Sequence, residues 1–366
     1  MRFLPTEEQA DFARALRGLL AGADVPAAVR ARAAGDLAPG RALWGRLAGA
    51  GLFAPAVPEA YGGAGLLPVE LTVALVEVGR AGVPGPVVET AAAAVLLARL
   101  GDEAVAKRFL PGLAAGEAAA TLVLPGGSPY APDADAAAYC FTVSEAGELR
   151  AGPGGAGGAP GRAGGAPLLR SADPARRLSL PPAGGELLAA GPHVTAAARE
   201  AAGWARLLTA AQCLGVGGEL LARTVEYARQ RTQFGMPIGG FQAVKHRLAD
   251  TLLALEFARP LLWAAALSLA PGEVAAAKLA AGEAAYGAAL TALQVHGAVG
   301  YTEELDLSLW LRKARPLRDA WGSPRACRAA VVAEAAAAEA AGQAGRFSCQ
   351  ETPKRSLTQP KRALKP

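Results

Sequence analysis

Two stretches of the sequence combine polar side chains with turn residues in a way that suits binding of a phosphorylated ligand. The first stretch, ARQRTQFGMPIGGFQAVKHRLAD, spans residues 228–250 and carries Arg231 and Gln242. A guanidinium offers several fixed donors at once, so Arg231 at a helix end can pair with a pyrophosphate oxygen. Gln242, near the start of the following helix, can donate to the same group, helped by the helix dipole.

The second stretch, LQVHGAVGYTEELDLSLWLRKAR, spans residues 293–315 and holds a turn of small residues. Gln294 precedes that turn, and Gly297, Ala298 and Gly300 let a backbone come close to a ligand. Each feature also has a plainer interpretation when taken alone. Arg231 can be a solvated charge at a helix end, and the two glycines can simply stop a helix.

The composition predicts a large, apolar molecule. The chain has 366 residues, of which 52% are hydrophobic and 19% charged. That length allows two or three domains, and the low charge favours an oligomer that hides surface. An uninterrupted apolar run of about 18 residues is missing from the sequence, so we expect no membrane-spanning helix.

The N-terminal sequence and the cysteines indicate a cytoplasmic protein. The chain begins MRFLPTEEQADFARALRGLL, which indicates an amphipathic helix rather than a signal peptide. The cysteines have no paired spacing, so neither a disulfide framework nor a metal site is expected. They are Cys140, Cys213, Cys327 and Cys349.

The net charge of +5 comes from the end of the chain. Residues 345–366 carry six basic residues and one acidic residue, which leaves 31 of each sign in the rest. A neutral body gives little support to a nucleic-acid interface. We expect residues 345–366 to be a basic, disordered tail.

The hydrophobic spacing predicts a mainly α protein with a small β-domain. Helical spacing runs from Thr6 to about residue 116, with helices expected over 40–50, 68–79, 87–100 and 103–113. Four longer helices are expected over 195–232, 241–269, 272–296 and 324–341, and their short connections indicate a bundle. The predicted domains are therefore helical (1–117), β (118–192) and a helical bundle (193–344).

The middle segment is rich in strand formers, unlike its flanks. AATLVLPGG, AYCFTV and ELRAGP are short and suit strands, and two further strands are expected near Leu168 and Leu178. We expect a reduced β-domain here.

The two stretches described above resemble motifs of the acyl-CoA dehydrogenases. The family pattern is an R-x-x-FG turn followed by F/H-Q and LAD, then Q-x-HGG-x-GY-T-E-E and a basic run. Residues 43–65, which end in AGLFAPAVPEAYGGAG, and the order of domains add to the resemblance. It covers about three quarters of the chain and implies an N-terminal helical domain, a middle β-domain and a C-terminal four-helix bundle.

The resemblance implies FAD as the cofactor. Its binding residues would be Arg231, Phe234, Gln242, Gln294 and the turn of Gly297, Ala298 and Gly300. In this family such residues reach across a subunit interface and hold the FAD of the neighbouring subunit.

The implied reaction is α,β-dehydrogenation of an acyl-CoA thioester, for which the chain lacks the expected base. The weakly acidic Cα proton requires a positioned carboxylate, yet the family's base position is occupied by Trp321. An alternative family position, on the first bundle helix, falls at Ala205. Glu200 lies about 140° around that helix from it and is expected to face elsewhere. Asp319 is the weak remaining candidate.

The middle segment retains only a trace of the family's flavin-ring contacts, in residues 121–136. Contacts to a neighbour's FAD are kept while those within the subunit are eroded. The chain is therefore most similar to the smaller, base-lacking subunit of actinobacterial heterotetrameric acyl-CoA dehydrogenases that act on steroid side chains.

That resemblance implies a sister subunit carrying the base, an acyl-CoA substrate of sterol or fatty acid β-oxidation, and an electron-transfer flavoprotein. Two alternatives stay open: a homo-oligomeric dehydrogenase with a relocated base, and a catalytically silent binding or scaffold protein.

Overall fold

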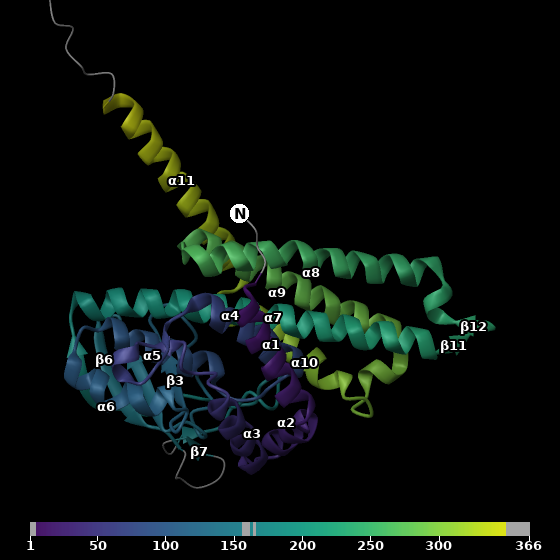
Figure 1. Ribbon diagram of the computed structural model, residues 1–366, viewed down its shortest axis with the longest axis horizontal. Helices are drawn as coiled ribbons and strands as arrows, with labels where there is room; N and C mark the ends of the chain where they lie inside the picture. The colour runs from purple at the N-terminus through teal and green to yellow at the C-terminus, as the bar shows by residue number, and fades with distance from the viewer. Residues whose placement is uncertain (1–4, 156–161, 164–165, 349–366) are drawn as a thin grey trace, which may run out of the picture.

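The computed structural model describes residues 5–155, 162–163 and 166–348, which form three packed parts (Figure 1). Six helices make the N-terminal part: α1 (Glu7–Ala21), α2 (Val25–Ala33), α3 (Ala38–Gly49), α4 (Pro68–Ala81), α5 (Val87–Arg99) and α6 (Glu103–Ala114). Thr6 caps α1 by accepting from the Gln9 amide, and the Gln9 side chain accepts from Thr6 in return. Between α3 and α4 lie the paired strands β1 (Ala56–Val57) and β2 (Gly65–Leu66), with the short helix η1 (Glu59–Tyr61).

The middle part contains a four-stranded sheet in the order β10-β6-β5-β3. The strands β3 (Ala120–Val123) and β5 (Tyr139–Val143) are parallel, whereas β6 (Glu148–Pro153) is antiparallel to both β5 and β10 (Glu186–Ala190). Four shorter strands form two pairs: β4 (Ala131–Pro132) with β9 (Leu178–Ser179), and β7 (Arg162–Ala163) with β8 (Ala166–Pro167).

The C-terminal part consists of long helices with short connections. They are α7 (Pro192–Gln230), α8 (Gln242–Ser268), α9 (Pro271–His296), α10 (Leu307–Asp319) and α11 (Pro324–Ser348). The hairpin β11 (Thr232–Gln233) and β12 (Met236–Pro237), with η2 (Ile238–Gly240), joins α7 to α8, and η3 (Gly297–Tyr301) follows α9.

The fold class expected from the sequence is confirmed: a helical domain, a small β-domain and a helical bundle. The prediction of four C-terminal helices was incomplete, because α10 is a fifth helix that packs on α7 and α9. The expected tail also starts too early, since α11 continues to Ser348, and residues 349–366 lie outside the described residues.

Helices α4 and α7 cross with almost no space between their backbones. A Cβ on Gly79 would lie 2.2 Å from the Gln212 carbonyl oxygen, and one on Gly215 would lie 2.0 Å from that of Val76. Only glycine permits such an approach. This crossing fixes the N-terminal domain against the bundle.

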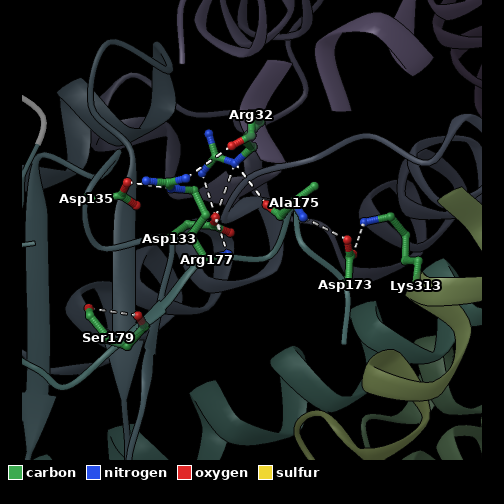
Figure 2. A network of polar contacts seen from close by, with 9 residues as sticks. Arg32, Asp133, Asp135, Asp173, Ala175, Arg177, Ser179 and Lys313 are labelled. Atoms are coloured by element: carbon green, nitrogen blue, oxygen red, sulfur yellow. Dashed lines mark hydrogen bonds and ion pairs between the residues drawn. The ribbon is translucent and has the colours of Figure 1, made fainter. Parts of the chain in front are cut away.

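A buried network of charges joins all three parts (Figure 2). Arg32 of α2 donates to Asp133 of the middle part at 2.6 Å, and Arg177 donates to Asp135, also at 2.6 Å. Asp173 accepts from Lys313 of α10 at 2.8 Å. Buried charges of this kind are tolerated when they are paired.

Helix α8 lies at the outside of the bundle and exposes apolar side chains (Figure 1). Leu253, Phe257 and Leu261 are 52%, 72% and 42% exposed. By length and composition alone α8 would be long and apolar enough to cross a membrane. That is weak evidence, because core helices of other proteins pass the same test.

Candidate functional site

The hairpin after α7 presents an arginine and a phenylalanine to solvent. Arg231 is the residue that ends α7, and its amide donates to the Tyr227 carbonyl at 2.8 Å. Phe234 and Gly235 form the two-residue turn, with φ values of 55° and 81°. Positive φ at both positions fits a tight hairpin and is unusual for phenylalanine. Phe234 is nevertheless 91% exposed, so the fold holds it outward.

Gln242 and the glycine turn provide further donors at the same end of the bundle. Gln242 is the first residue of α8, where helix amides are unpaired, and its side chain is exposed. Gly297 ends α9 with φ 62°, and Gln294, Gly297 and Ala298 are exposed while Gly300 is buried.

The two motifs are brought together by a ring contact. Tyr227, one turn before Arg231, stacks on His296 with ring centroids 4.1 Å apart. The Tyr227 hydroxyl also donates to the His296 carbonyl at 3.5 Å. Burial lowers the pKa of His296, which favours a neutral ring in this contact. Residues more than 60 positions apart therefore lie on one exposed surface.

An exposed arginine and the start of a helix are groups that can bind an anion. Within the described residues no carboxylate pairs with Arg231, so its guanidinium is available to an anion. Gln242 at a helix start and the small residues of η3 complete a set of donors around open space. All seven residues expected to contact the cofactor lie on these elements: Arg231, Phe234, Gln242, Gln294, Gly297, Ala298 and Gly300.

A second feature, the cavity at the family's base position, lies between the middle part and the bundle. It has a volume of about 370 Å³ and is lined by residues of the loop after β3 and by residues 319–323 after α10. The two segments that the sequence linked to the flavin ring and to the base therefore share one cavity. Trp321 lines it, as does Asp319, whose side chain is exposed at the end of α10.

The other carboxylate considered from the sequence lies elsewhere. Glu200 accepts from Arg99 of α5 at 2.8 Å on the surface of α7. Ala205, at the alternative base position, is fully buried, and Trp204 beside it is 1% exposed. Neither position places a carboxylate at the cavity.

The sequence motifs did not reveal a buried glutamate next to Trp321. Glu89 of α5 is 6% exposed and accepts from the Trp321 indole Nε1 at 3.1 Å. Arg176 lies 3.6 Å from the same carboxylate oxygen. Burial raises the pKa of Glu89 despite the opposing charge of Arg176. The sequence did hold one indication of this buried carboxylate, because Glu89 stands in the largely apolar α5 sequence VVETAAAAVLLAR.

The surface around Arg231 and the cavity beside Trp321 lie far apart in the molecule. The hairpin β11–β12 lies at one end of the bundle, whereas the sheet of the middle part packs near the other end of α7 (Figure 1). The cavity meets α7 at Ala202 and Arg206, and Arg206 lies 25 residues before Arg231, or about 38 Å along the helix, so the two features are well separated. Each feature would form half of a site.

The remaining chemistry of the described residues is limited. Cys140, Cys213 and Cys327 are free and buried, and burial raises the pKa of Cys140 to about 12. No group of three metal-ligating side chains occurs in the part of the chain that the structure describes.

These elements define a class of protein, a mainly helical scaffold with a small β-domain and a C-terminal helical bundle. Comparison with known proteins makes this specific. Residues 6–117 match the acyl-CoA dehydrogenase N-terminal domain, and residues 195–337 match the acyl-CoA dehydrogenase C-terminal domain. Residues 118–194 lie between the two matched stretches.

Full-length relatives agree. The chain is 35% identical to acyl-CoA dehydrogenase IpdE2 of Mycobacterium tuberculosis over 88% of its own length and 95% of the relative. It also resembles a chain of the ChsE4-ChsE5 complex of Mycobacterium tuberculosis, with a TM-score of 0.78 and 26% identity over 92% of this chain and 99% of that one. A variant of the Tcur3481-Tcur3483 steroid ACAD gives a TM-score of 0.77 at 27% identity, over 90% and 99%.

The chain therefore belongs to the acyl-CoA dehydrogenase family, whose members are FAD-dependent oxidoreductases. The resemblance stated from the motifs is confirmed.

Proposed function

We propose that this chain is the base-lacking subunit of a heteromeric acyl-CoA dehydrogenase. Its sister subunit supplies the catalytic carboxylate, the flavin-ring pocket and most of the acyl-CoA site. This chain supplies Arg231, Gln242 and the turn of residues 294–300 to the FAD of the sister. When bound, FAD would supply the acceptor for the hydride that leaves Cβ of the thioester.

One observation carries the proposal: Arg231 and Gln242 lie exposed at one end of the bundle, while Trp321 lines the cavity near the other end of α7. Arg231 and Gln242 are exposed, so they are available to a ligand held by another chain. Trp321 has no group that accepts a proton at neutral pH. A single chain therefore provides only one half of each site.

The exposed face of α8 supports assembly. An open groove of about 720 Å³ runs between α8 and α9, bordered by Phe257 and Leu261. Large apolar side chains exposed next to one another on a helix are typical of a protein interface. Gln242 lies at the start of α8, beside this groove. A subunit that covered the groove would therefore lie next to Gln242.

The substrate class follows from the relatives and is part of the proposal. The names of the related steroid ACAD and of IpdE2 favour a ring-bearing or fatty acyl-CoA thioester, degraded in the cytoplasm. By analogy with the family, an electron-transfer flavoprotein would be the electron acceptor of the assembled enzyme.

The role of Arg231 is tested with the complex formed with a sister acyl-CoA dehydrogenase that carries an intact glutamate. Arg231→Ala is expected to lower FAD affinity at least tenfold, since a charge-assisted contact to a phosphate is worth about 1.5 to 3 kcal/mol. Arg229→Ala is the matched control, because Arg229 is also exposed and lies in the same last turn of α7. Equal FAD affinity for both variants would contradict the proposal.

A further inference from the structure

The turn between α10 and α11 separates the cavity at the base position from a second, inner cavity. The outer cavity measures about 370 Å³ and the inner one about 40 Å³. Arg176, Ala320 and Trp321 line both. The indole of Trp321 thus stands as part of a wall between two spaces.

The backbone of this wall is held in an unusual conformation by side chains from two helices. Trp321 has φ 56°, which non-glycine residues rarely adopt, and Gly322 follows with φ 150°. Arg206 of α7 donates to the Trp321 carbonyl at 3.1 Å. Lys278 of α9, which is 1% exposed, donates to the carbonyls of Arg318 at 2.7 Å and Gly322 at 3.3 Å.

The indole ring is anchored separately. Its Nε1 donates at 3.1 Å to Glu89, which lies on α5. A buried carboxylate needs such a donor, because leaving it without a partner is costly. Contacts from α5, α7 and α9 together specify one position for Trp321, a pattern typical of a functional constraint.

The space behind the indole does not suit a hydrocarbon. The inner cavity has room for about three water molecules. Its walls include Glu89, Asp133, Asp173, Arg176 and Lys313, of which Asp133, Asp173 and Lys313 belong to the charged network of Figure 2. An acyl chain that passed the indole would meet buried charges, which is unfavourable.

We propose that the indole of Trp321, anchored by Glu89, fills the place of an acyl chain at this chain's base position and so acts as a plug. The inference rests on the proposed function, because the cavity is assigned to an acyl group through the base position. Trp321 would then do more than replace the base, because its indole would also keep the acyl group of the substrate out of this chain. A pair of unlike chains then binds one acyl thioester, in the sister subunit.

The test is a calorimetric titration of the complex of both subunits with butyryl-CoA, and with CoA as the reference ligand. The wild-type complex is expected to bind one butyryl-CoA per pair of chains. Trp321→Gly removes the indole and should raise this number to two. At the new site butyryl-CoA should bind at least about tenfold more tightly than CoA, because three carbon atoms of the acyl chain would be buried in the space left by the indole, in front of the charged inner cavity.

Two controls separate the plug from a general effect of tryptophan. Trp321→Phe keeps a ring in the slot and should leave one butyryl-CoA per pair. Trp310→Phe changes a buried tryptophan that donates to Arg80 away from this cavity, and it should also leave one. Two molecules per wild-type pair, or one per Trp321→Gly pair, would overturn the plug.

The plug and the proposed function fail in different ways. If no complex forms, the proposed function fails, and the titration is repeated on this chain alone. For the wild-type chain alone, the plug predicts that butyryl-CoA and CoA bind with equal affinity. Only in the Trp321→Gly chain should butyryl-CoA bind more tightly than CoA. If Trp321→Gly does not fold, a crystal of the wild-type protein soaked in butyryl-CoA decides, since an acyl chain beside Trp321 would refute the plug.

Discussion

At the residue scale, the decisive contact is between two side chains that the sequence does not relate. Trp321 could be placed at the base position from motif spacing alone. Its partner Glu89 could not, because the two residues are 232 positions apart and meet only once α5 packs near α10. Motif spacing predicts the positions of residues within one segment, but a contact between two domains can be found only from the three-dimensional structure.

Glu89 also gives a prediction about pH. Because burial raises its pKa in the folded chain, the folded state holds this proton more tightly than the unfolded state does. The stabilising contribution is complete below the unfolded pKa of about 4.3 and is lost as the pH rises through the folded pKa. Gln cannot ionise, so the stability of Glu89→Gln relative to wild type should increase between pH 4 and pH 8.

Denaturant unfolding of both proteins across that pH range measures the difference. Glu117→Gln serves as a control, because Glu117 is exposed, and its difference from wild type should stay nearly constant. A Glu89→Gln difference that is flat or falls with pH would show that Glu89 is not a carboxyl with a raised pKa.

At the element scale, the long helices could be predicted from hydrophobic spacing, and most ends fell within a few residues. The spacing did not reveal α10, which carries Pro316 inside it and several basic residues. It also missed β10, a largely exposed strand with little alternation that is held by pairing with β6. Both elements depend on neighbours for their stability, so their local sequence is a weak signal.

The crossing of α4 and α7 provides an element-scale prediction. Gly215→Ala would place a Cβ 2.0 Å from the Val76 carbonyl oxygen, so the helices must separate. We expect a loss of about 3 kcal/mol in the free energy of unfolding. Gly203→Ala in the same helix meets nothing within 4 Å and should gain about 0.5 to 1 kcal/mol. Equal effects of the two substitutions in thermal unfolding would contradict the close crossing.

At the scale of the whole molecule, the buried charges of Figure 2 tie the three domains into one unit. Asp133 accepts from Arg32, and both side chains are under 5% exposed. Asp133→Asn keeps the shape and tolerates the residue's φ of 55°, but it leaves Arg32 without a carboxylate. The expected cost is about 3 to 5 kcal/mol in chemical unfolding.

The exposed pair of Arg108 and Glu186 offers the comparison, because both side chains are 54% exposed. Glu186→Gln should have a much smaller effect on stability, because solvent screens this pair. Similar losses for the buried and the exposed pair would mean that the network does not join the domains.

The measurement that tests the account most directly is the amount of FAD bound per chain, read from absorbance. It is made on this chain purified alone and on the chain co-expressed with a sister acyl-CoA dehydrogenase that has the catalytic glutamate. The account predicts little or no flavin in the lone chain and about one FAD for every two chains in the complex. A lone chain that carries one FAD per protomer would contradict it.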